Sequence, residues 1–121
     1  SGTTKKMRSG IMYEQGEIVV VPFPFSDLSV IKQRPVIIIS KNTDNAEMED
    51  VITCGITSNI KNSKHSVLIS NEDLERGEIP KQSRIKVDKL FTMDQKIIRK
   101  KVAKVNRQTF NKLKEVFLNL V

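Results

Sequence analysis

The chain has 121 residues, 38% of them hydrophobic, which is enough for one domain with a single modest core and argues against a disordered chain. Its Lys and Arg residues outnumber Asp and Glu by 21 to 14, a net charge of +7 that favours a polyanionic partner such as nucleic acid, although a basic surface that serves only solubility gives the same count. One cysteine and one histidine exclude an internal disulfide, a zinc site of several thiolates and RNA cleavage by a histidine pair, and no apolar run reaches the ~18 residues of a membrane span.

Residues 1–11 form a polar leader with three basic residues and no acidic one. They lack the apolar stretch of a secretory signal, so we expect a disordered leader or an expression scar, followed by a single domain over residues 12–121. Without the leader the net charge is +4, which weakens the nucleic-acid argument without removing it. Together with the composition, this favours a cytoplasmic protein with no metal ion, no cofactor and no membrane anchor.

Runs of β-branched residues predict strands along most of the chain. The expected strands are residues 17–22, 34–40, 50–58, 66–70, 83–87 and 96–105, the last of which could also begin a helix. Between them we expect a loop over 23–33, an acidic solvent loop over 42–50, a polar turn over 59–64 and one helical turn over 71–77. We expect Pro22 and Pro24 to end the first strand in a turn, and Pro35 to lie at the start of the second. The unbroken apolar run of this second strand predicts burial on both faces.

A helix is expected at the C-terminus. Asn106 is a favourable N-cap, and the apolar residues that follow recur at helical spacing on one face. These residues are Phe110, Leu113, Val116, Phe117 and Leu120. The predicted fold is mainly β, a small, curled, antiparallel sheet with one C-terminal helix.

Polar residues at the ends of two expected strands are the best candidates for a site. Arg34 opens the second strand, and Thr57 lies near the end of the third. If the two strands pair, both side chains could face one mouth of the sheet. A guanidinium binds a phosphate bidentately, and a threonine hydroxyl can donate to a phosphoryl oxygen or orient a ribose 2′-OH. Alternatively, Arg34 is a charge at a strand edge and Thr57 belongs to a turn.

Other candidates have two interpretations each. His65 is either a general base or, in its lysine-rich turn, a solvated surface residue. Cys54 lies in an apolar strand, which favours a buried, inert thiol over a nucleophile. Phe23 and Phe25 could stack on bases, or one of them belongs to the core. The basic run 99–101 is either a solvated face or a track for a phosphate backbone.

Residues 16–29 (GEIVVVPFPFSDLS) and 32–40 (KQRPVIIIS) strongly resemble the MazF/PemK toxin family. Residues 56–58 (ITS), 83–92 (SRIKVDKLFT) and 98–105 (IRKKVAKV) agree in order and spacing, and the resemblance extends over about residues 14–120. It implies an SH3-like β-barrel that forms a homodimer and acts as the toxin of a prokaryotic type II toxin–antitoxin module. It also implies a metal-independent endoribonuclease that cuts single-stranded RNA at short sequences, by attack of the ribose 2′-OH on the adjacent phosphorus.

The resemblance assigns roles to individual residues. The catalytic arginine and threonine of the family fall on Arg34 and Thr57. The loop 23–33 covers the RNA groove, into which a cognate antitoxin inserts an acidic, disordered tail. The residues expected to contact RNA are Phe25, Ser26, Lys32, Ser58, Asn59, Ser83 and Arg84.

Two alternative functions are kept. One is a CcdB-like toxin that poisons DNA gyrase on the same scaffold, a class that uses a tryptophan near the end of its last helix. This chain has no tryptophan, which argues against that class. The other is a catalytically silent relative that binds RNA or antitoxin.

Overall fold

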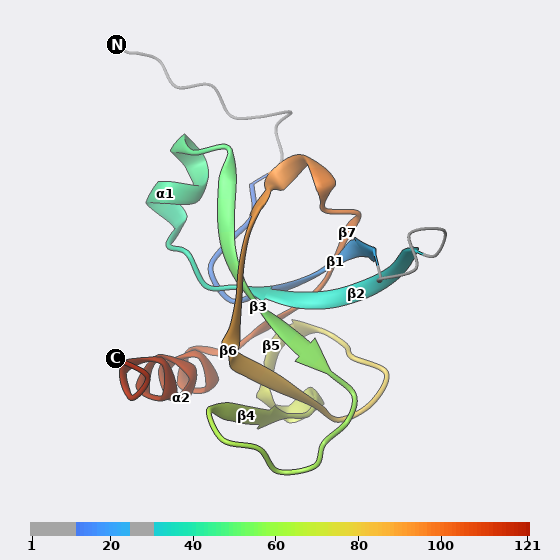
Figure 1. Cartoon of the computed structure of the whole chain (residues 1–121), viewed down its shortest axis with the longest axis vertical. Coiled ribbons are helices and arrows are strands. Elements are labelled where there is room, and N and C mark those ends of the chain that lie inside the picture. Colours follow the sequence, from blue (N-terminus) through green and yellow to red (C-terminus); the bar gives the residue numbers. More distant parts are fainter. Residues whose placement is uncertain (1–11, 25–30) are drawn as a thin grey trace.

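The computed structural model describes residues 12–24 and 31–121 and contains a seven-stranded antiparallel sheet that curls upon itself, with a helix at the C-terminal end (Figure 1). The strand order is β4-β6-β3-β2-β1-β7-β5. The strands are β1 (Glu17–Pro24), β2 (Ile31–Ile38), β3 (Asp50–Thr57), β4 (Ser66–Ile69), β5 (Leu74–Gly77), β6 (Ser83–Asp94) and β7 (Lys100–Val105). The helices are α1 (Asn42–Glu47) and α2 (Arg107–Leu118), with 3-10 turns η2 (Asn71–Asp73) and η3 (Gln95–Ile97). The expected mainly β fold is confirmed, and the predicted leader lies outside the described residues.

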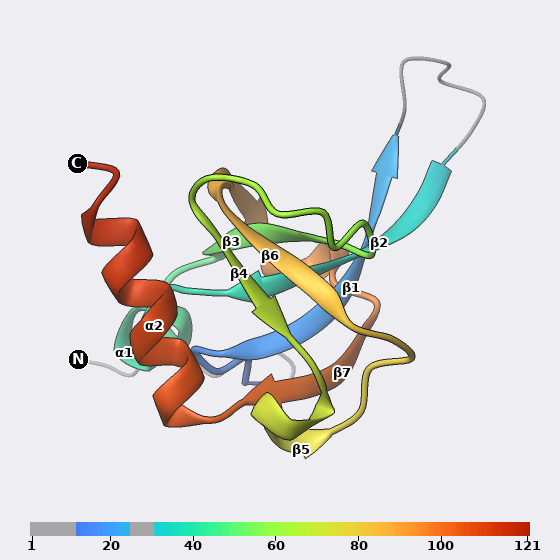
Figure 2. The ribbon, with the colours of Figure 1, turned by 90° about the horizontal axis from the view of Figure 1, so that it is seen from below.

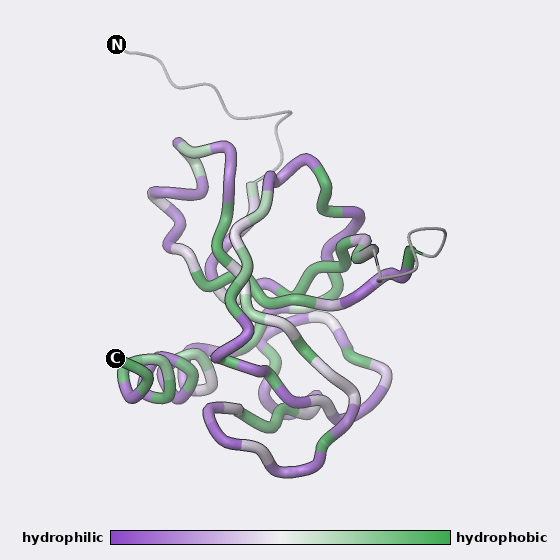
Figure 3. Tube along the Cα trace, in the orientation of Figure 1, coloured by the Kyte–Doolittle hydropathy of each residue, from purple (hydrophilic) through white to green (hydrophobic). Residues whose placement is uncertain are grey.

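The core lies on both faces of the sheet. Along β2, Ile37 belongs to the larger hydrophobic cluster, which α2 covers with Leu113, while Val36 and Ile38 belong to a second cluster on the other face. All four side chains are at most 1% exposed, which confirms the predicted burial of this strand on both faces. Hydrophobic residues follow the inner stretches of the strands, and the connecting segments are mostly hydrophilic (Figure 3). Within the described ranges, neither helix is long and apolar enough to cross a membrane.

The first two strands extend further than expected. Pro22, Phe23 and Pro24 pair with residues 33, 32 and 31, so the predicted turn at the prolines is wrong and both ends of the predicted loop 23–33 are strand, while residues 25–30 lie outside the described residues. Pro35 lies within β2 and pairs with Val20. These prolines are tolerated because β1 beyond Val20 and β2 before residue 36 are paired on one side only. The two strand ends project from the sheet as a two-stranded arm (Figure 2).

Two other expected segments also differ. The acidic stretch forms the short helix α1, because Asn45 is buried and its amide donates to the carbonyl oxygens of Tyr13 and Ser40 at 2.9 and 3.0 Å. Six residues would not form a helix without such tertiary contacts. The predicted helical turn over 71–77 is confined to η2, and its second half is strand β5, which pairs with β7.

Asn106 caps α2 as predicted, because its side-chain oxygen accepts a hydrogen bond from the backbone N–H of Thr109 at 2.8 Å. We expect Asn106→Ala to lower the free energy of unfolding by about 1 kcal/mol, measured by urea denaturation. Asn106→Asp keeps an acceptor at this position and is the matched control. Equal losses in the two variants would contradict the capping role.

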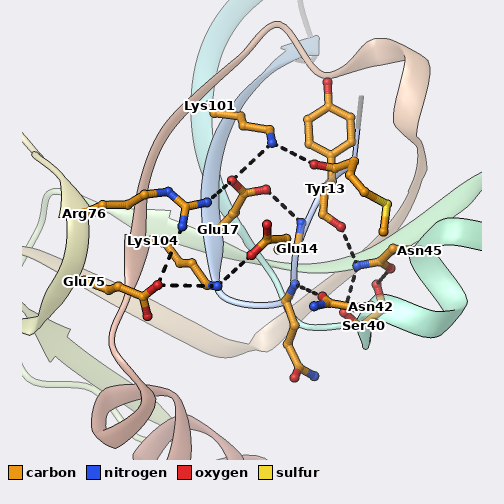
Figure 4. A network of polar contacts seen from close by, with 12 residues as sticks. Tyr13, Glu14, Glu17, Ser40, Asn42, Asn45, Glu75, Arg76, Lys101 and Lys104 are labelled. Atoms are coloured by element: carbon orange, nitrogen blue, oxygen red, sulfur yellow. Dashed lines mark hydrogen bonds and ion pairs between the residues drawn. The ribbon is translucent and has the colours of Figure 1, made fainter. Parts of the chain in front are cut away.

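A polar network fixes the start of β1 to β5 and β7 (Figure 4). The carboxylate of Glu17 is only 1% exposed and pairs with Arg76 at 2.8 Å and with Lys101 at 3.4 Å. Beside it, the ammonium group of Lys104 lies 2.7 Å from the carboxylate of Glu14. These ion pairs offset the free-energy cost of burying the Glu17 carboxylate. They also engage two of the lysines of β7 within the protein.

The hydrogen bond from Lys104 holds the pKa of the Glu14 carboxyl below its ordinary value of 4.5. A lowered pKa in the folded state means that this pair stabilises the fold above the ordinary pKa and that the stabilisation is lost as the pH falls through the lowered value. We expect Glu14→Gln to reduce the free energy of unfolding at pH 7 and to have less effect at pH 3. Because the Glu14 side chain is about a third exposed, the difference should be about 0.2–1 kcal/mol. Urea denaturation at both pH values measures it, with Glu115→Gln on the exposed side of α2 as control.

Candidate functional site

Three neighbouring hollows lie around the ends of β2 and β3. The central hollow, about 210 Å³, is lined by Phe23, Arg34, Pro35, Val36, Gly55, Ile56, Thr57, Lys86, Lys89 and Phe91. The lysine hollow, about 310 Å³, is lined by Thr57, Asn59, Lys61, Asn62, Ser63, Lys86 and Lys89. The apolar hollow, about 560 Å³, has a floor of Ile18, Val20, Ile56, Ile69, Ile79 and Val102 and a rim that includes Lys32, Arg34, Ser58, Glu78, Lys81, Ser83 and Lys100. Shared lining residues join the central hollow to the other two.

Arg34 and Thr57 come together in the central hollow. Val36 on β2 pairs with Gly55 on β3, so continuing this register by two residues sets Arg34 across from Thr57. Residues opposite each other in an antiparallel pair point to the same face of the sheet. Both side chains are partly exposed, so the guanidinium and the hydroxyl can reach a ligand in the hollow.

The hydroxyl of Thr57 is oriented by the segment that follows it. The backbone N–H of Asn59 donates to Thr57 Oγ1 at 3.1 Å, and the side chain of Asn59 accepts from the backbone N–H of Lys61 at 3.1 Å. Because Thr57 Oγ1 accepts this bond, its own proton can be donated to a ligand oxygen.

Aromatic side chains form one wall of the central hollow. The rings of Phe23 and Phe91 pack edge to face, with centroids 5.0 Å apart and an interplanar angle of 85°. Gly55 lies beside Phe91, where an added Cβ would approach the ring to 3.5 Å. The missing side chain keeps this wall open, and the two rings, which are partly buried against the second cluster, leave an aromatic surface that suits stacking on a base.

Positive charge dominates the three hollows. Seven basic side chains line them, and Glu78 is the single acidic residue that does so among the described residues. The basic residues are Lys32, Arg34, Lys61, Lys81, Lys86, Lys89 and Lys100. Clustered cations beside a preorganised arginine and hydroxyl suit a chain of phosphodiesters. No group of His, Cys, Asp and Glu among the described residues is arranged to hold a metal ion.

The other expected contact residues divide into three groups. Lys32, Ser58 and Ser83 line the apolar hollow, and Asn59 lines the lysine hollow. Phe25 and Ser26 lie outside the described residues. Arg84 lines none of the three hollows.

Arg84 is 9% exposed and its guanidinium is engaged by the segment between β3 and β4. Its Nε and Nη2 donate to the carbonyl oxygen of Ile60 at 3.3 and 3.2 Å, and its Nη1 donates to Ser66 Oγ at 3.1 Å. These bonds fix the segment that carries Asn59 and Lys61. The structure therefore supports a positioning role for Arg84 better than direct contact with a ligand.

Two candidate reactive groups lie apart from the hollows. His65 lines none of them, and its backbone adopts a left-handed conformation with φ 59°. Cys54 is fully buried as predicted, and burial raises the pKa of its thiol to about 12. It therefore stays protonated and unreactive near neutral pH. Of the basic run 99–101, Lys100 lines the apolar hollow, and Lys101 is paired with Glu17.

Lys61, Lys86, Lys89 and Phe91 were not among the predicted site residues. The alternation of residues 83–87 indicates that Lys86 points away from the neighbouring buried Ile85 and Val87, so its exposure could have been inferred. The position of Lys89 could not, because it depends on an irregular register between β3 and β6.

Residues 14–121 match the family described as PemK-like, MazF-like toxin of type II toxin-antitoxin system. No curated protein sequence shows significant similarity to the chain. Among solved structures, an endoribonuclease in complex with its cognate antitoxin from a mycobacterial species has a TM-score of 0.72 and 17% identity, covering 88% of this chain and 91% of that one. MazE-MazF from Deinococcus radiodurans has a TM-score of 0.72 and 16% identity, covering 91% and 96%. The Mycobacterium tuberculosis toxin MazF-mt6 has a TM-score of 0.65 and 16% identity, covering 84% and 93%. At these identities the similarity shows the fold.

Proposed function

The chain belongs to the PemK-like, MazF-like toxins of type II toxin–antitoxin systems, and on this premise we propose that it is a metal-independent endoribonuclease that cleaves single-stranded RNA at short sequences. The observation that carries the proposal is the meeting of Arg34 and Thr57 in the central hollow, with six lysines lining it and the two adjoining hollows. A cleft of this composition attracts a polyanion, and the two side chains supply donors for one phosphate.

In the proposed reaction, the ribose 2′-oxygen forms a bond to the adjacent phosphorus, and the bond from phosphorus to the 5′-oxygen breaks. The products are a 2′,3′-cyclic phosphate and a 5′-OH. The guanidinium of Arg34 stabilises the added charge of the five-coordinate phosphate and donates a proton to the leaving 5′-oxygen, a proton that it regains from solvent water. A guanidinium has no lone pair available to accept a proton, so Arg34 does not act as the base, and the 2′-OH proton passes to solvent water. Thr57 donates its hydroxyl proton to a phosphoryl oxygen and holds the phosphate in line.

The remaining candidate residues are assigned to the nucleotides on either side of the cut. In this proposal Ser58, Asn59 and Ser83 contact RNA at the rims of the hollows, with Lys32 on the projecting arm. We also propose that Phe25 and Ser26, which lie outside the described residues, contact RNA. Arg84 acts indirectly by fixing the segment after β3.

We propose the same basic hollows as the binding site of an acidic antitoxin tail, because opposite charge accelerates such association. We also propose a homodimer, supported by large apolar side chains at the surface, such as Ile52, Leu90 and Leu118, which are 43%, 44% and 64% exposed. Light scattering at low micromolar concentration should give twice the 13.8 kDa of the chain. A species of single-chain mass would contradict the dimer.

The test of the activity is incubation of the protein with a long single-stranded RNA in excess EDTA, followed by sequencing of the fragment ends. We expect discrete fragments that carry 5′-OH ends at a recurring short sequence. Intact RNA that is nevertheless bound would instead indicate the silent relative, and inhibition of DNA gyrase without loss of RNA would indicate the CcdB-like class. Random degradation, or cleavage only when metal ions are added, would also contradict the proposal.

A further inference from the structure

The lysine hollow differs from the other two in having no apolar floor. It is lined entirely by polar and basic residues of the end of β3, of the segment after it and of β6. Three of these residues are lysines: Lys61, Lys86 and Lys89. Within the described part of the chain, none of their ammonium groups forms an ion pair with a carboxylate. Lys101 and Lys104, by contrast, are both paired with glutamates.

An irregularity in the sheet builds this concentration of charge. In a regular strand, Lys86 and Lys89 would point to opposite faces, because residues three apart differ by an odd number of positions. Here Cys54 pairs with residue 90 of β6 but the next residue, Gly55, pairs with Lys86, so the strand bends over residues 87–89. Bulges of this kind redirect side chains. Both lysines consequently line the same hollow.

Neighbouring contacts hold the hollow in shape. Lys86 Nζ donates to Ser63 Oγ at 3.2 Å, and Ser63 Oγ in turn lies 3.1 Å from Ser66 Oγ. Arg84 fixes the same segment through Ile60 and Ser66. Lys86 and the backbone of the segment that carries Lys61 are therefore already held in place, which lowers the cost of ordering the site when an anion binds.

We propose that the lysine hollow binds the backbone phosphate of the nucleotide next to the one cleaved. This inference rests on the proposed function, because Thr57 lines both the central hollow and the lysine hollow and so links the two phosphate positions. An RNA chain that presents its scissile phosphate to Arg34 and Thr57 continues past Thr57 into the three lysines. The hollow holds one tetrahedral anion through charge and reads no base, so it raises affinity on one side of the cut without adding sequence specificity.

The test is a thermodynamic cycle between the protein and a short RNA that contains one cleavage sequence. Each phosphate of the RNA is replaced in turn by an uncharged methylphosphonate, and binding is measured in the Arg34→Ala background so that no cleavage occurs. We expect one position next to the scissile phosphate at which the replacement weakens binding about tenfold. The double variant Lys86→Met/Lys89→Met should lose the same affinity on native RNA and lose nothing further on the RNA modified at that position. For the double variant, the slope of log K against log salt should be smaller in magnitude by about 0.7, as expected for one lost phosphate contact.

Lys64→Met is the matched control, since Lys64 is an exposed lysine of the same segment that does not line the hollow. Additive losses from the methylphosphonate and the lysine variant would overturn the proposal, as would equal losses at every phosphate position. Unchanged RNA binding combined with weaker binding of an oligoglutamate peptide would assign the hollow to an acidic peptide instead. A wild-type protein that gives this coupled pattern but cuts no RNA would refute the proposed activity and leave the phosphate site standing.

Discussion

Arg34→Ala should reduce the rate of RNA cleavage by at least about 10²–10³-fold while leaving the fold intact. The guanidinium is the group in the central hollow that can contact two phosphate oxygens at once, so its loss leaves the charge of the five-coordinate phosphate without its strongest donor. The measurement is the single-turnover rate on an RNA with one mapped cut. Circular dichroism and urea denaturation verify that the variant is folded.

Arg34→Lys separates the geometry of the guanidinium from its charge, because lysine keeps the charge but cannot form the bidentate contact. We expect this variant to lose most of the rate as well. Arg107→Ala, which removes an exposed arginine from the first turn of α2, should cleave RNA normally. A folded Arg34→Ala protein with the wild-type rate would refute the assignment of Arg34.

Gly77→Ala should lower the free energy of unfolding by about 2–4 kcal/mol. Gly77 has φ +78° and pairs with Ala103, and an added Cβ would overlap the carbonyl oxygen of Val102 and lie 2.6 Å from Ala103 Cα. These are backbone atoms of β7, so the clash cannot be relieved by turning a side chain. The cost combines the left-handed backbone conformation with separation of β5 from β7.

Gly16→Ala is the matched control. Gly16 has a similar φ of +93°, but an added Cβ there would meet only side-chain atoms, the nearest at 3.5 Å. It should therefore cost only the conformational part, about 1–2 kcal/mol. Urea denaturation of both variants measures the difference, and equal losses would show that the close approach of β5 to β7 does not matter.

The strands and the C-terminal helix were predictable because their signals are local. Runs such as residues 36–38 favour strands whatever they pair with, and Asn106 caps α2 with an atom three residues from its partner. The prediction for residues 42–50 was wrong because the contacts that decide their structure are not local. Their acidic composition indicates a loop, and the buried contacts of Asn45 that form α1 come from Tyr13, 32 residues away.

The residues of the candidate site also differ in how far the sequence alone could predict their roles. Arg34 and Thr57 could be singled out because each lies near the end of an apolar strand, and the pairing of β2 with β3 joins them. Arg84 was expected to contact RNA, but its guanidinium is occupied by the carbonyl oxygen of Ile60 and by Ser66, contacts that no spacing along the chain reveals.

By itself, the sequence of this protein determined where six of its seven strands lie along the chain, the cap of its last helix and the two polar residues at the ends of β2 and β3. These depend on the conformational preferences of a few consecutive residues. Only the tertiary structure decided that prolines continue β1 and β2 where each is paired on one side, and that a bend in β6 turns Lys86 and Lys89 into one hollow. Such features depend on the register between strands, which is set by contacts between residues far apart in the chain.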